Sequence, residues 1–124
     1  MDHEELTAYL RELRERWAGV TDSAVAAVDG LLIAADTQES LDAEKLAALA
    51  AAELGLARRV TTATDRGALR RAICHGSQGP VAIYAVGDTA VLVVLGDEGL
   101  DLVRLHQESK AIVDRVDALL TDKA

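Results

Sequence analysis

The chain has 124 residues and a mass of 13.1 kDa, which suits one domain spanning residues 1–124. Hydrophobic residues make up 50% of it and charged residues 27%, so we expect a folded core and no extended disorder. Only 2% of the residues are aromatic, and 13 basic against 21 acidic residues give a net charge of −8. These values exclude aromatic platforms for single-stranded nucleic acid and disfavour binding to a phosphate backbone.

The cysteine count and the length of the apolar segments bear on the cellular compartment. Cys74 stands alone, so the chain cannot form an internal disulfide, and a structural zinc site would lack most of its thiolates. The first residues are acidic where a secretory signal is basic, and the apolar runs 47–52 and 89–95 are too short to cross a bilayer. We therefore expect a cytoplasmic protein with no nucleic-acid partner and no direct membrane insertion.

The first predicted element is an amphipathic helix from Asp2 to Gly19. Asp2 and Glu5 have the spacing of a capping box, which satisfies free N–H groups at a helix start. An apolar stripe recurs at i, i+4, i+7 and i+11, with charged residues on the other face and a glycine at the end. The stripe comprises Leu6, Leu10, Leu13 and Trp17.

Two apolar segments, 20–28 and 31–35, then flank a turn signal. Asp29-Gly30 lies between them, and this pair tolerates the positive φ angles of a tight turn. The pattern predicts a β-hairpin.

Residues 45–62 predict a central helix that begins after Asp42 and is apolar around most of its circumference. The segment has no proline and many alanines, which favour helix. A surface helix normally carries a single apolar stripe, so one side is expected to pack on its own sheet and another on a different partner. Glu53 lies inside the apolar arc, which indicates that part of the arc is not sealed core. The arc comprises Leu46, Ala47, Leu49, Ala50, Ala51, Leu54, Leu56, Ala57 and Val60.

Three further strands and a last helix complete the chain. Segments 69–75, 80–86 and 89–95 are predicted strands, separated by turns at 76–79 and 87–88. An amphipathic pattern over 102–120 predicts the final helix. The order α-β-β-α-β-β-β-α predicts an α+β fold, with a five-stranded, mainly antiparallel sheet and helices packed on its faces.

This order of elements resembles the Roadblock/LC7 family. The resemblance rests on segment 25–34 with its Asp-Gly turn between apolar strands, on the small-residue helix at 43–50, and on segment 86–95 followed by the C-terminal helix. It covers nearly the whole chain, and the alanine-rich sequence is similar to actinobacterial members. It implies a single Roadblock/LC7-like domain, with the central helix on one sheet face and the terminal helices on the other.

The resemblance also implies a function. Members of the family form homodimers or heterodimers and bind Ras-like small GTPases, with central helices packed together and third strands paired into one continuous sheet. Bacterial members are often linked to a sensor-kinase-like membrane protein. A non-catalytic dimeric adaptor is therefore implied, paired with itself or a paralogue. It would regulate a Ras-like small GTPase in bacterial signalling, bind no cofactor, and be cytoplasmic or recruited to the membrane by its partners.

Two sets of residues are candidates for these contacts. The second apolar side of the central helix and the polar third strand predict a dimer interface comprising Ala47, Ala50, Ala51, Leu54, Arg58, Arg70, Ala72 and Cys74. Basic residues gathered within an acidic chain, with one glutamate, predict a partner surface comprising Glu53, Arg59, Arg66 and Arg71. The alternative interpretation of these charges is a solvated helix end and loop.

Other kinds of site find less support. Cys74 and His75 are adjacent on a predicted strand, so their side chains point to opposite faces and are poorly placed to bind one metal ion. On a strand at the edge of a dimer, Cys74 is expected to be a small buried residue rather than a reactive thiol. The chain has no recognisable catalytic triad, carboxylate pair or phosphate loop, so we expect no enzyme activity. The alternative function is a small ligand-sensing domain, which is disfavoured because the predicted inward positions carry few polar groups.

Overall fold

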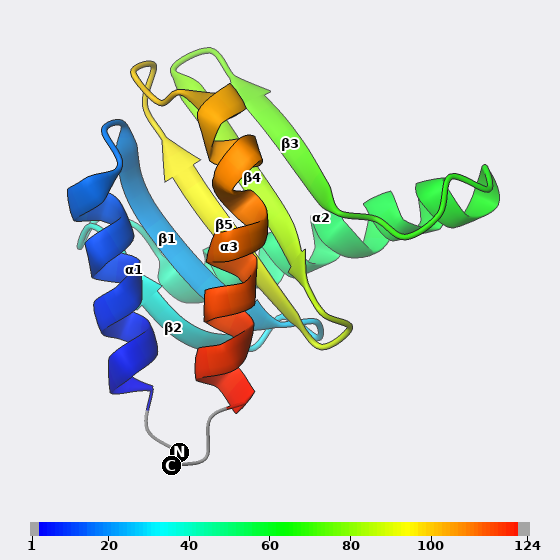
Figure 1. The fold of residues 1–124 in the computed structure, drawn as a ribbon, viewed down its shortest axis with the longest axis horizontal. Helices are drawn as coiled ribbons and strands as arrows, with labels where there is room; N and C mark the ends of the chain where they lie inside the picture. The colour runs from blue at the N-terminus through cyan, green and yellow to red at the C-terminus, as the bar shows by residue number, and fades with distance from the viewer. Residues whose placement is uncertain (1–2, 122–124) are drawn as a thin grey trace.

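The computed structural model describes residues 3–121, and these form three helices and one five-stranded sheet (Figure 1). The helices are α1 (Glu4–Arg16), α2 (Ala43–Ala63) and α3 (Leu102–Thr121). The strands are β1 (Val20–Ala27), β2 (Leu32–Asp36), β3 (Arg71–Gly76), β4 (Gly79–Val86) and β5 (Ala90–Gly96). The predicted order of elements is confirmed. Neighbouring strands lie in the order β2-β1-β5-β4-β3, and all four pairs are antiparallel.

The sheet separates two hydrophobic cores. The larger core lies under α1 and α3, where Leu10, Leu105 and Val116 pack against inward residues of β1, β4 and β5. The smaller core lies under α2, where Leu54 and two alanines pack against Ile83 and its neighbours. The expected arrangement, with the central helix on one face and the terminal helices on the other, is therefore confirmed (Figure 1).

The ends of α1 differ from the sequence-based prediction. The helix begins at Glu4 after His3, which forms no side-chain capping hydrogen bond, and the predicted cap Asp2 lies outside the described residues. It ends at Arg16 rather than at Gly19. Gly19 serves the next turn instead: its φ is +91°, and a Cβ there would clash with the backbone of Leu100.

Two other local predictions are confirmed by the geometry. Gly30 has a φ of +97°, and the Asp29 carboxylate accepts a hydrogen bond from the Leu31 N–H at 3.1 Å, which closes the β1–β2 hairpin. Asp42 caps α2 by accepting a hydrogen bond from the Lys45 N–H at 3.0 Å. These turn residues set where the hairpin and the central helix begin.

The central helix crosses the whole sheet and extends past its far edge. The chain leaves β2 at one edge and must enter β3 at the other, and α2 contacts all five strands on the way. Its 21 residues give a length of about 31 Å, whereas four strand spacings make the sheet about 19 Å wide. The last buried residue of the helix is Leu54, and Figure 1 shows the C-terminal part of α2 projecting beyond β3. We call residues 55–63 the α2 overhang.

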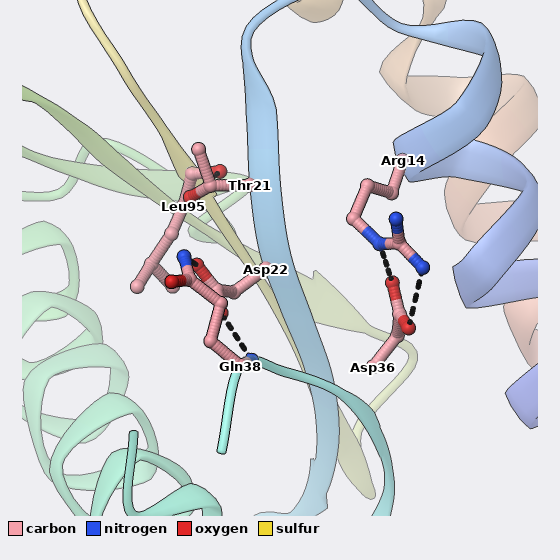
Figure 2. Close-up of polar contacts among 6 residues, drawn as sticks. All are labelled: Arg14, Thr21, Asp22, Asp36, Gln38 and Leu95. Carbon is pink, nitrogen blue, oxygen red and sulfur yellow. Dashed lines mark hydrogen bonds and ion pairs between the residues drawn. The ribbon is translucent and has the colours of Figure 1, made fainter. Parts of the chain in front are cut away.

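Polar contacts hold the β2 edge in place (Figure 2). The Asp22 carboxylate on β1 is 4% exposed and accepts hydrogen bonds from the Gln38 backbone N–H at 2.9 Å and side-chain amide at 3.4 Å. On the other sheet face, the Arg14 guanidinium of α1 donates to both oxygens of Asp36, at 2.6 and 3.2 Å. The Asp22 contact fixes the connection from β2 to α2, and therefore the point at which α2 starts across the sheet.

Replacing Asp22 with alanine should destabilise the fold. The substitution leaves the Gln38 N–H without its acceptor, so we expect Asp22→Ala to lower the free energy of unfolding by about 2 kcal/mol in urea titrations. Asp88→Ala, in the exposed β4–β5 turn, is the matched control and should change the free energy of unfolding by less than about 0.5 kcal/mol. Equal effects of the two substitutions would contradict a specific role for Asp22.

Candidate functional site

One part of the predicted dimer interface is corrected by the structure. Ala47, Ala50, Ala51 and Leu54 are all less than 8% exposed, and they lie on the side of α2 that faces the sheet. Alanine side chains let the helix lie close to the strands, and Leu54 fills the space between them. Because these four residues are enclosed by their own chain, they are not available to a second copy. The sequence showed two apolar sides of the helix but did not indicate which one faced inward.

The other apolar side of α2 faces solvent. Leu49, Leu56 and Val60 are 59%, 59% and 62% exposed, and their spacing places them on one line along the helix. Ala52 and Glu53 are exposed between them. We call Leu49, Leu56 and Val60 the outer stripe. It runs from the part of α2 above the sheet into the overhang, and it is the apolar side that the sequence pattern left without a partner.

β3 forms a free edge of the sheet next to the overhang. It pairs with β4 alone, so one side of its backbone has no partner strand among the described residues. Ala72 lies opposite Ile83 and is half-buried on the α2 face, and Cys74 lies opposite Val81 on the same face. Cys74 is exposed in the single chain, at the edge where a second copy is expected to cover it. An edge strand is covered by one neighbour only, so its side chains remain accessible.

The arginines predicted to form one cluster are divided between two faces. Arg58 is half-buried and donates a hydrogen bond to the Gly87 carbonyl at 3.3 Å, so its own chain already engages it. Arg59 and Arg66 are exposed on the overhang and on the loop after it. Arg71 lies opposite Tyr84 in the β3–β4 register, which places it on the α3 face of the sheet. The predicted partner surface is therefore not continuous with Arg71.

Metal and membrane sites gain no support from the described residues. Cys74 and His75 occupy consecutive positions of β3 and point to opposite faces. Across residues 3–121, no three His, Cys, Asp or Glu side chains are grouped so as to hold a metal ion. Within the same range, no helix has the length and apolar character needed to cross a bilayer.

A second surface feature lies on the α3 face, and sequence reasoning missed it. A groove of about 560 Å³ runs between α3 and the β3–β4 pair. Arg70 and Arg71 line it from β3 and the residue before it, His106 and Lys110 line it from α3, and Tyr84 contributes from β4. We call it the α3–β3 groove. These residues are scattered along the sequence and are brought together only by the packing of α3 on β4. No local motif therefore predicted the groove.

A hydrogen bond between Tyr84 and His106 lies at the wall of this groove. The Tyr84 hydroxyl is 2.8 Å from Nδ1 of His106, and the two rings meet edge to face. Burial raises the pKa of Tyr84 to about 12, although the charge of Arg71 acts in the opposite direction. Burial lowers the pKa of His106 below 6.5, and the positive charges of Arg71 and His75 lower it further. At neutral pH the hydroxyl is therefore protonated and the imidazole uncharged, and the tautomer of His106 decides which of the two groups donates the hydrogen bond.

Comparison with known proteins gives the family. The Roadblock/LC7 domain family profile matches residues 7–96. An uncharacterized protein of Methanocaldococcus jannaschii, MJ0310, is 32% identical over 101 residues, which are 82% of this chain and 88% of that protein.

Solved structures show the same fold. A Roadblock/LC7 domain from Streptomyces avermitilis superposes with a TM-score of 0.85 at 22% identity, covering 94% of this chain and 98% of that one. Myxococcus xanthus MglB superposes with a TM-score of 0.86 at 19% identity, covering 97% and 98%. With the family profile matching most of the chain and the fold agreeing from α1 to α3, this protein belongs to the Roadblock/LC7 family.

Proposed function

We propose that the chain is a dimeric, non-catalytic adaptor that binds and regulates a Ras-like small GTPase in bacterial signalling. Membership of the Roadblock/LC7 family supports the class of partner, since the family resemblance implies GTPase-binding dimers. The observation that supports dimerisation is the α2 overhang, an amphipathic helix end that its own sheet does not cover.

The overhang and outer stripe are suited to a second copy of the chain. About 12 Å of helix projects past the sheet, which is slightly more than the width of two further strands. If two β3 edges pair about a twofold axis, each overhang reaches over the sheet of the other chain and lies beside the partner's α2. Leu49, Leu56 and Val60 are then removed from water, at about 25 cal/mol for each Å² of apolar surface buried.

Pairing of the β3 edges also satisfies the backbone. An unpaired edge leaves a row of N–H and C=O groups free, and an antiparallel copy of the same strand supplies matching groups. The α2 face of β3 carries Ala72 and Cys74, which are small enough to permit close approach beneath the helices. The two copies would then share one continuous sheet, as the family resemblance implies.

The charged residues around the overhang are the proposed contact for the GTPase. Arg59 and Arg66 are exposed and lie outside the pairing edge, so they carry the proposed contact, whereas Glu53 lies between Leu49 and Leu56 and borders the dimer interface. Charges at the rim of an interface mainly steer association and select the partner. In this proposal the nucleotide is held by the GTPase, and the adaptor acts in the cytoplasm or at a membrane to which a sensor-kinase-like partner recruits it.

The oligomeric state tests the first half of the proposal. We expect the wild-type chain to have twice the chain mass in light scattering at micromolar concentration, and Leu56→Asp to shift it to monomer because a carboxylate interrupts the outer stripe. Val103→Asp is the matched control, since Val103 is 68% exposed on α3, and this variant should stay dimeric. A monomeric wild-type chain, or equal dissociation of both variants, would contradict the proposed interface.

A binding assay tests the second half. The chain should bind a Ras-like GTPase encoded beside its own gene, with a difference between the GDP-loaded and GTP-loaded forms. Arg59→Glu should weaken this binding about tenfold and make it less sensitive to salt, because a favourable charge contact is lost, without changing the dimer. Arg11→Glu, an equal charge change on the exposed side of α1, should leave it unaltered. Binding to neither loaded form would favour the ligand-sensing alternative.

A further inference from the structure

The α3–β3 groove presents positive charge that its own chain does not neutralise. Arg70 and Arg71 are exposed, and neither forms an ion pair with any carboxylate among residues 3–121. The described lining of the groove includes no aspartate or glutamate, although the whole chain has a net charge of −8. The third cation, Lys110, is engaged by Asp114 at 2.8 Å and so contributes less. Arg71 is therefore free to receive an anion on the α3 face, and Arg70 adds positive charge where it lines the groove.

Behind these charges the groove has ordered hydrogen-bonding groups. Tyr84 is 3% exposed and holds the His106 ring through Nδ1, which leaves Nε2 as a polar atom that Tyr84 does not use. The Ser109 hydroxyl is held in turn by the His106 carbonyl at 2.7 Å. A side chain fixed in this way loses little conformational entropy when it binds a ligand.

The remaining lining is apolar and the volume suits a small molecule. Leu69, Ala85 and Val113 line the groove beside the polar groups. A volume of about 560 Å³ falls within the range of roughly 300–1,000 Å³ found for small-molecule sites. The groove therefore offers charged hydrogen-bond donors with apolar surface next to them. This arrangement suits a ligand that has an anionic group and an organic portion.

We propose that the α3–β3 groove binds a small phosphate monoester. The planar guanidinium group of Arg71 matches the oxygens of a phosphate, which carries close to two negative charges at neutral pH, and Arg70 adds positive charge at the end of the groove. His106 Nε2 donates a further hydrogen bond in the tautomer that is protonated there, and the organic group lies against the apolar lining. All of these residues belong to one chain, so the site depends neither on dimerisation nor on the GTPase.

Titration with phenyl phosphate, followed by NMR of the isotopically labelled chain, tests this site. We expect saturable shifts confined to residues that line the groove, and binding weakened about tenfold by Arg71→Gln because one charged contact is lost. Arg11→Gln removes an equal charge from exposed α1 and should leave the affinity unchanged within about twofold. Absent or unsaturable shifts, or equal weakening by the two substitutions, would overturn the proposal.

The His106 imidazole supplies an independent readout. A bound phosphate offsets the charge of Arg71, so phenyl phosphate should raise the pKa of His106 from its lowered value in the wild-type chain. Arg71→Gln should raise this pKa without any ligand, and phosphate should then change it little. A His106 pKa that does not respond to phenyl phosphate in the wild-type chain would contradict binding at this place.

The same phosphate chemistry occurs free in solution and on lipid headgroups, and sedimentation separates the two sources. The chain is mixed with phosphatidylcholine vesicles with and without phosphatidic acid. Binding of phenyl phosphate without vesicle binding identifies a soluble ligand, and vesicle binding that requires both phosphatidic acid and Arg71 identifies a lipid headgroup. If neither probe shows dependence on Arg71, the groove is not a phosphate site.

Discussion

The length of α2 relative to the width of the sheet is the constraint on which the rest of the structure depends. The chain must pass from the β2 edge to the β3 edge, and it does so with one unbroken helix of 21 residues. The sheet is too narrow to cover such a helix along its whole length. The side of α2 that faces the sheet is therefore buried as far as Leu54, and the residues after it extend beyond the sheet. Burial of the alanines and exposure of the outer stripe are two consequences of the same geometry. A protein that needed only a covered sheet would be served by a shorter helix.

The alternation of side chains along β3 assigns two different surfaces to one short strand. Ala72 and Cys74 face the α2 side, where small residues permit close packing, whereas Arg71 and His75 face the α3 side. The positive charge of Arg71, which would repel the same residue of a second copy, therefore faces the groove. An acidic protein can in this way carry a local positive site without placing it in the proposed interface. The edge position of β3 keeps both surfaces accessible.

The sequence predicted most of the fold because its signals are local. The Asp29-Gly30 turn, the Asp42 cap and the periodicity of the helices depend on neighbouring residues, and all appear in the structure. The orientation of α2 could not be predicted from local signals. An alanine-rich helix has two similar apolar sides, and only packing on the sheet determines which of them is buried. The groove joins Arg71, Tyr84 and His106, which no spacing along the chain relates.

Amide hydrogen exchange along the two edge strands tests most directly whether the β3 edge and the α2 overhang form an interface with a second copy. β3 and β2 are both edges of the same sheet, so β2 serves as the internal reference. We expect the outward N–H groups of residues 71–76 to become protected as the protein concentration rises, while those of residues 32–36 do not change. Outward β3 amides that exchange as fast as those of β2 at every concentration would contradict it.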